Sequence, residues 1–242
     1  PDLLVTQALC DVCAVAADEV DAAACALPGR PRVLNLEPMS LADVFATLRL
    51  VADAAGVPAA AATAIAALEA RIDRVRALVA GRPVPRVGFL EWIDPPFNGG
   101  HWTPELIALA GGHDVFAAAG QPSRTRSLAE LAALAPDVVV IACCGFGIER
   151  AAADLPALVA HPDWQRLPAV AAGRVYLADG NHFFNRPGPR LVDSLEILAR
   201  ALHPDAAPGV LPAAGPLVTV SARGDIRPAP LAETRGPPRV TI

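Results

Sequence analysis

The chain has 242 residues, a formal net charge of -5, 53% hydrophobic residues and 19% charged residues. Such a chain can bury a sizeable core and lies far from the composition of disordered proteins. Its acidic balance offers no basic surface for a phosphate backbone, so we expect no nucleic acid partner. The longest apolar stretch, from Ala54 to Leu68, is interrupted by Pro58 and is shorter than the ~20 residues that a membrane-spanning helix needs.

An internal repeat predicts two similar α/β lobes. Residues 1–7 resemble residues 136–142, because each segment is a Pro-Asp pair followed by a short apolar strand that runs toward a cysteine. A helical stretch and a second strand follow in both copies, over 32–36 in the first and over 174–178 in the second. Helices must cross between such strands, so the repeated order implies a parallel sheet in each lobe.

The second copy is preceded by a predicted strand over 86–91, a helix over 103–110, a short strand near Val115 and a helix over 127–134. The first copy has no counterpart of these elements before it, so we expect its lobe to be incomplete. The expected organisation is a remnant of the N-terminal lobe over 1–39, lobe-closing and inter-lobe helices over 40–81, a C-terminal α/β lobe over 82–203, and a Pro-rich tail over 204–242 with one short strand around 217–220.

Residues 58–80 are expected to form one long helix between the lobes. Their apolar side chains recur at alternating spacings of three and four and define a single stripe: Ile65, Leu68, Ile72, Val75 and Val79. At ~1.5 Å per residue the helix would be about 35 Å long, which suits a rigid connection between two small lobes. An ordinary surface helix has the same pattern, so both interpretations stay open.

Ligands bind at the carboxyl ends of the strands in open parallel sheets. The loops that follow the predicted strands of the second lobe cover 92–102, 143–147 and 179–187, and they contain six of the eleven aromatic residues: Trp92, Phe97, Trp102, Phe146, Phe183 and Phe184. Aromatic rings on loops indicate a wide, flat ligand surface. Phe97 and Phe184 could instead cap the core.

Three sequence runs resemble cobalamin-binding members of the periplasmic iron/cobalamin-binding family. They are the run from Glu91 to Phe97, the Cys-Gly-Phe-Gly turn that begins at Cys144, and the run from Asn185 to Arg190. The resemblance covers residues 1 to about 203. It implies a two-lobed solute-binding protein that catalyses nothing, needs no cofactor and holds cobalamin or a related metal chelate between its lobes. It also implies a periplasmic or other extracytoplasmic location and an ABC transporter permease as partner. The half-lobe that we expect to be missing corresponds to the N-terminal part of the family's fold.

The candidate ligand contacts are aromatic and polar side chains on the three loops: Trp92, Asp94, Phe97, His101, Trp102, Cys144, Phe146, Asn181, His182, Phe183 and Arg186. The resemblance further suggests that a carboxylate on each lobe pairs with arginines of the permease. Glu130 is the candidate in the C-terminal lobe. It also fits a capping box with Ser127, in which it would close the start of its own helix.

Cysteine chemistry offers two alternative functions. Cys10 and Cys13 follow a predicted strand and open a helix, where a thiol pKa is lowered and redox chemistry is favoured. The same pair could form a zinc site with Cys143 and Cys144, joined by His101 or His182. The interpretation favoured over a zinc site is that these cysteines are small buried apolar residues. The sequence has no G-x-S-x-G or H-E-x-x-H motif, which argues against a hydrolase.

Overall fold

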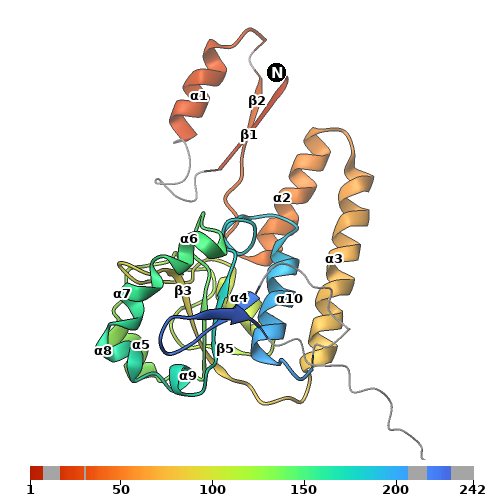
Figure 1. The fold of residues 1–242 in the computed structure, drawn as a ribbon. Coiled ribbons are helices and arrows are strands. Elements are labelled where there is room, and N and C mark those ends of the chain that lie inside the picture. Colours follow the sequence, from red (N-terminus) through yellow and green to blue (C-terminus); the bar gives the residue numbers. More distant parts are fainter. Residues whose placement is uncertain (8–16, 30, 207–216, 230–242) are drawn as a thin grey trace, which may run out of the picture. The chain divides into compact units, whose positions relative to one another are not determined.

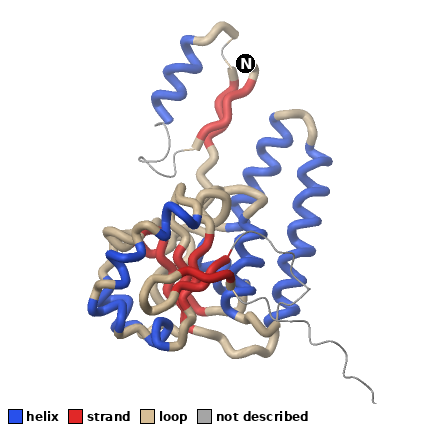
Figure 2. The backbone as a smooth tube through the Cα atoms, in the orientation of Figure 1, coloured by secondary structure: helices blue, strands red, loops and turns tan. Residues whose placement is uncertain are grey.

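A computed structural model describes residues 1–7, 17–29, 31–206 and 217–229 (Figure 1, Figure 2). The chain divides into two compact units, Pro1–Glu69 and Ala70–Ile242. Strands and helices occur in both units, so the predicted α/β class is confirmed for each.

The first unit contains a small parallel sheet. Its strands β1 (Leu3–Thr6) and β2 (Arg32–Asn35) pair in parallel, as the repeat predicts, and α1 (Ala17–Ala26) lies between them in the sequence. Leu34 of β2 and Ala24 of α1 are buried. The other two helices of this part of the chain are α2 (Leu41–Ala54) and α3 (Pro58–Val79).

A capping box starts α2. The backbone N–H of Asp43 donates to the Ser40 hydroxyl at 3.1 Å, and the Ser40 N–H donates to the Asp43 carboxylate at 3.0 Å. These two bonds satisfy donors that a helix start otherwise leaves unpaired. The long helix α3 agrees with the predicted helix over 58–80 and carries the chain from one unit into the next, because the boundary between the units falls inside it.

The described strands of the second unit form one mixed sheet in the order β4-β3-β6-β7-β8-β9, with β5 beside β3. They are β3 (Arg86–Trp92), β4 (Phe97–Asn98), β5 (His113–Asp114), β6 (Val138–Ile141), β7 (Val175–Ala178), β8 (Leu217–Val220) and β9 (Ile226–Pro228). The central pairs are parallel, as predicted. The antiparallel strands β4, β8 and β9 extend its two edges. The segment 204–242 therefore adds two strands to the sheet, where we expected a tail with one strand.

Helices cover both faces of this sheet (Figure 1). On one face lie α4 (Thr103–Leu109) and α10 (Leu191–Leu202). On the other lie α5 (Leu128–Leu134), α6 (Ile148–Ala152), α7 (Leu155–Val159), α8 (Pro162–Gln165) and α9 (Pro168–Ala171). Trp164 of α8 is fully buried in this second layer, in one cluster with Leu90, Val139 and Leu177 of the sheet. Because both faces are covered, the residues of β6 and β7 are all apolar and all buried.

An ion cluster joins the end of α3 to α10 within the second unit. The Arg71 guanidinium donates to both carboxylate oxygens of Glu196, at 2.9 and 2.7 Å, and also to Asp193. The Glu196 side chain is only 1% exposed, so its charge depends on this partner. Hydrogen bonding to Glu196 raises the Arg71 pKa above its ordinary value. The cluster holds α10, which follows the last of the candidate loops, against α3.

Candidate ligand-binding site

The candidate site lies at the carboxyl edge of the central parallel strands. The strands β3, β6 and β7 run in the same direction and are neighbours in the sheet, so their carboxyl ends meet at one edge. The three loops that contain the sequence-predicted contacts leave the sheet at this edge.

Backbone hydrogen bonds link each of these loops to the next. The N–H of Cys144 donates to the carbonyl of Glu91 at 3.1 Å, which joins the second loop to the end of β3. The N–H groups of Gly180 and Asn181 both donate to the carbonyl of Phe146, at 3.0 and 3.1 Å, which joins the third loop to the second. Fixed loops of this kind favour a preformed binding surface.

Gly180 and Asn185 tighten the contact between the second and third loops. The Asn185 side-chain amide donates to the carbonyls of Ala142 and Gly180, at 3.1 Å each. A Cβ atom at Gly180 would lie 2.1 Å from the carbonyl oxygen of Cys143, so no larger residue fits there without a shift of the backbone. The close approach of the two loops explains why residue 180 is a glycine.

Trp92 and Phe146 form an aromatic pair at this edge. Their ring centroids are 4.6 Å apart and the ring planes are inclined by 47°. The indole N–H of Trp92 donates to the carbonyl of Asp94 at 3.0 Å, and the Arg150 guanidinium lies 4.2 Å from the Phe146 ring centroid. Both rings are half-buried. The pair, which joins the first loop to the second, therefore leaves aromatic surface available at the edge of the sheet.

The third loop adds polar groups. The carboxylate of Asp179 accepts from the backbone N–H groups of Asn181 and His182, both at 2.9 Å, and one ring nitrogen of His182 lies 2.8 Å from the same carboxylate. The Arg186 guanidinium donates to the Asn181 carbonyl at 2.9 Å. His182 and Arg186 are exposed and Phe183 is half-buried. The loop thus presents donors and acceptors with restricted positions.

Trp102 and Phe184 lie inside the unit. Trp102 is 5% exposed, and its indole N–H donates to the carbonyl of Phe184 at 2.6 Å. The ring of Phe184 lies 5.4 Å from that of Phe89, and its backbone N–H donates to the Ser194 hydroxyl. Trp102 thus supports the third loop from within, whereas we expected it on the ligand surface. Phe184 belongs to the core, which was one of the two interpretations. Phe97 is half-buried in β4.

His101 lies against a neighbouring segment of the chain. Its backbone N–H donates to the Gln121 carbonyl at 2.6 Å, and its carbonyl accepts from Gly120 at 2.9 Å. Burial lowers the pKa of the His101 imidazole below its ordinary value, so the ring is neutral at neutral pH. A neutral imidazole can donate and accept hydrogen bonds at the same time.

The structure places Cys143 in the core. Its side chain is 1% exposed, and burial raises the pKa of its thiol to about 12, so the thiol is protonated at neutral pH. Over the ranges that the structure describes, no three His, Cys, Asp or Glu side chains gather where they could hold a metal ion. Cys10 and Cys13, which the redox and zinc interpretations both need, lie outside the described residues.

Glu91 is a residue that the sequence analysis did not select. It is the last but one residue of β3, and its carboxylate accepts from the Gly100 N–H at 3.2 Å and from the side chain of Ser123. Burial raises its pKa to about 7. An acidic residue directly after the buried run 87–90 of this strand was the signal that could have identified it. Glu91 connects β3 both to the turn at Gly100 and to the segment around Ser123.

Glu130 closes the start of α5, as the capping-box interpretation predicts. The Ser127 N–H donates to the Glu130 carboxylate at 2.8 Å, and the Glu130 N–H donates to the Ser127 hydroxyl at 3.2 Å. The other carboxylate oxygen lies 3.4 Å from the Arg126 guanidinium. The backbone hydrogen bond from Ser127 lowers the Glu130 pKa, so this exposed group stays ionised.

Several solved structures are similar to this chain. A periplasmic haem-binding protein from Pseudomonas aeruginosa is 25% identical, with a TM-score of 0.69, and the match covers 85% of this chain and 73% of that one. The apo form of a periplasmic haem-binding protein from Roseiflexus is also 25% identical, with a TM-score of 0.67 and coverage of 86% and 77%. A periplasmic vitamin B12-binding protein from Vibrio cholerae is 21% identical, with a TM-score of 0.61 and coverage of 84% and 74%.

The sequence profile of the periplasmic binding proteins matches residues 15–181, which is more than half of the chain. No curated protein sequence is significantly similar to it. The chain belongs to the periplasmic binding protein family, whose members are the substrate-binding components of uptake systems. The family resemblance that the sequence motifs indicated is therefore confirmed. In the part of the chain that the structure describes, no helix combines the length and the apolar character needed to span a bilayer.

Replacing Gly180 by Ala should destabilise the loop contact. The added Cβ overlaps the Cys143 carbonyl, and we expect the free energy of unfolding to fall by about 1 to 3 kcal/mol, the usual cost of overpacking. Urea denaturation followed by circular dichroism measures the change. Gly188→Ala is the matched control, because a Cβ there meets no atom within 4 Å. Equal effects of the two substitutions would contradict the role of the contact.

Burial of Glu91 should make stability depend on pH. Its pKa rises from 4.5 in the unfolded chain to about 7 in the folded protein, so the folded state binds the proton more tightly. Stability therefore falls as the pH rises between these two values, and the loss persists above them. At a pH of about 8 we expect Glu91→Gln to be more stable than the original protein by at most about 3 kcal/mol.

The difference should vanish at a pH of about 4, where Glu91 is protonated in both states. Thermal unfolding across the pH range measures it. Glu149→Gln, which removes an exposed carboxylate from α6, is the control for the change in net charge. If the melting temperature of Glu91→Gln depended on pH in the same way as that of the original protein, the Glu91 carboxyl would not be the cause of the pH dependence. Burial also raises the pKa of Asp114, to about 6, so this group lowers the stability of both proteins as the pH rises.

Proposed function

We propose that this chain is the ligand-binding component of an ABC uptake system and that it captures cobalamin or a related metal chelate. The observation that carries the proposal is the aromatic pair of Trp92 and Phe146, held at the carboxyl edge of the sheet on loops that are hydrogen-bonded to one another. Partly exposed rings offer a large apolar contact surface at a small cost in side-chain entropy.

The chemistry of the surrounding side chains supports this ligand class. Corrin and porphyrin chelates combine a wide apolar ring with polar substituents at its margin. The aromatic pair suits the ring, while Asn181, His182 and Arg186 supply polar groups for the margin. Two of the similar structures are described as haem-binding proteins and one as a vitamin B12-binding protein, which is the same class of ligand. On this proposal the site binds and releases its ligand unchanged.

The proposal includes a periplasmic location and a permease partner. The family membership supports both. Glu130 is the proposed docking carboxylate of this unit, since it is exposed, ionised and fixed in position by Ser127. Its roles in helix capping and in docking are compatible, because the hydrogen bonds to Ser127 occupy one carboxylate oxygen, while the other lies 3.4 Å from the Arg126 guanidinium on a side chain that is 50% exposed.

Ligand titrations with the purified chain test the proposal directly. Absorbance changes on addition of cyanocobalamin, haemin or a ferric hydroxamate siderophore measure affinity for each chelate. Trp92→Ala and Phe146→Ala should each weaken binding of the preferred chelate by about 1 to 3 kcal/mol, the effect of losing an aromatic anchor. Val84→Ala, which trims a side chain that is 63% exposed, is the control. No saturable binding of any of the three chelates, or unchanged affinity in both aromatic variants, would contradict the proposal.

Removal of the Glu130 charge should separate docking from binding. Glu130→Gln keeps the capping box, in which glutamine is an equivalent partner, but leaves no carboxylate for an arginine of the permease. We expect the chelate affinity to stay unchanged while ligand-stimulated ATPase activity of the transporter in proteoliposomes falls about tenfold, as for loss of one charged contact at an interface. Glu149→Gln should leave both quantities unchanged. Full activity of Glu130→Gln would exclude Glu130 from docking.

A further inference from the structure

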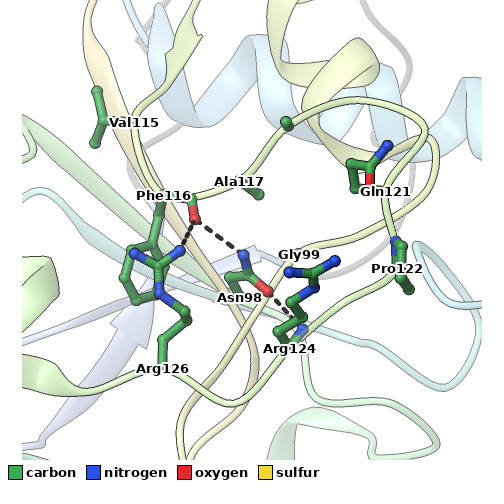
Figure 3. Close-up of a pocket in the computed structure, with 10 residues that line it drawn as sticks. Asn98, Gly99, Val115, Phe116, Ala117, Gln121, Pro122, Arg124 and Arg126 are labelled. Carbon is green, nitrogen blue, oxygen red and sulfur yellow. Dashed lines mark hydrogen bonds between the residues drawn. The ribbon is translucent and has the colours of Figure 1, made fainter.

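A pocket of about 320 Å³ opens beside the candidate ligand surface, within the second unit (Figure 3). It lies between the end of β4, at Asn98 and Gly99, and the segment from Val115 to Arg126. No residue that the sequence analysis selected as a ligand contact lines it. Its volume is at the lower end of the range for small-molecule sites, about 300 to 1,000 Å³.

Asn98 fixes the two walls of this pocket relative to each other. Its side-chain amide donates to the Phe116 carbonyl at 2.9 Å and accepts from the Arg124 N–H at 2.7 Å (Figure 3). Its own backbone N–H donates to the Arg124 carbonyl at 3.1 Å. Asn98 is 6% exposed, so these bonds are protected from water. The pocket is therefore preformed, which reduces the entropy lost when a ligand binds.

Two guanidinium groups line the pocket. The Arg126 side chain donates to the Phe116 carbonyl at 3.0 Å, and its guanidinium carbon lies 4.7 Å from the Phe116 ring centroid. In Figure 3 the Arg124 side chain extends toward the middle of the pocket. Among the described residues, the Arg124 guanidinium forms no hydrogen bond or ion pair with a protein group, since only its backbone takes part in the contacts with Asn98. The Arg126 guanidinium is thus held in position, and the Arg124 guanidinium is available to bind a ligand.

Among the described residues, no carboxylate forms an ion pair with Arg124, and three carboxylates of adjoining segments have other contacts. Glu130 is engaged by Ser127 and Arg126. The Oδ1 atom of Asp114 accepts from the backbone N–H groups of Phe116 and Ala117, at 2.8 and 3.0 Å, while its buried Oδ2 atom has no hydrogen-bond partner among the described residues. Glu91 accepts from Gly100. The pocket therefore has a positive charge that an external anion can pair with.

The rest of the lining is mainly apolar. Val115, Ala117, Ala118 and Pro122 contribute hydrocarbon surface, and the Gln121 amide adds one polar side chain. Such walls disfavour a strongly hydrated inorganic anion or a sugar phosphate and favour an organic body. Arginine pairs with a carboxylate through two parallel hydrogen bonds, which adds orientation to the charge attraction.

We propose that this pocket binds a carboxylate group with an apolar body, through Arg124 and Arg126. The acid could be a small free molecule or a substituent of the transported chelate, and both offer the same chemistry to the pocket. The site itself does not depend on the proposed function, because it is defined by residues outside the aromatic surface.

Benzoate and benzamide are matched probes for this pocket, since they differ in charge but hardly in shape. Calorimetric titration of the whole chain should give benzoate an affinity roughly tenfold higher than that of benzamide. Arg124→Gln should remove most of this difference. The variant keeps the fold, because Arg124 contacts Asn98 through its backbone. Arg76→Gln, which makes the same charge change on an exposed part of α3, should bind benzoate like the original protein.

Arg126→Lys provides a second test that does not depend on Arg124. It keeps the charge but loses the planar donor pair, and we expect weaker benzoate binding, measured below the melting temperature of the variant. The proposal is overturned if benzoate shows no saturable binding at millimolar concentration, if benzamide binds equally well, or if Arg124→Gln binds benzoate as the original protein does.

Competition distinguishes the two sources of the carboxylate. Benzoate that weakens the binding of haemin, which bears carboxylate substituents, would identify the pocket as part of the chelate site. Independent binding of both would identify a separate site for a small acid. Either result supports the pocket as a carboxylate site. Failure of every chelate to bind would contradict the proposed function and leave the benzoate result intact.

Discussion

The contact between Gly180 and the carbonyl of Cys143 determines how the candidate site is assembled. The last residues of β6 and β7 are neighbours in a parallel sheet, so the loops that follow them must leave the sheet side by side. A Cβ at position 180 would prevent their close approach. Because the approach is possible, the Phe146 carbonyl can accept from two N–H groups of the next loop, and Asn185 can bridge both loops. The positions of Phe146, Asn181 and Arg186 all follow from this arrangement.

The ionisable side chains at the carboxyl edge of the sheet differ in their charge at neutral pH. Burial keeps the Cys143 thiol protonated, and it gives Glu91 a pKa near neutrality, so neither group is a permanent charge at the surface. The arginines, in contrast, are charged and exposed or half-buried: Arg124, Arg126, Arg150 and Arg186. An edge with aromatic surface and positive charge is suited to hold a large ligand with polar margins.

Much of the second unit could be predicted from local sequence patterns. The strands at 138–141 and 175–178 are short apolar runs, and the strand at 86–92 contains such a run over 87–90. A run of this kind, buried on both faces of a sheet, can be recognised without knowing which strands it pairs with. The helix start at Ser127 follows from capping chemistry that spans only three residues. The loop motifs were distinctive enough to indicate the family. The strand β9 lacked such a signal, since its three residues are all exposed and include a proline.

The sequence alone determined the α/β class, the two repeated units, the family and the loops that surround the candidate site, because each depends on periodicity or on motifs contiguous in the chain. Only the tertiary structure decided which of the loop residues face outward. Trp102 and Phe184 are both buried, and the Trp102 indole N–H donates to the Phe184 carbonyl across 82 positions in the sequence. The pocket of Arg124 and Arg126 likewise depends on Asn98, which contacts residues far along the chain. Such contacts arise only when the chain is folded, so no local pattern in the sequence could reveal them.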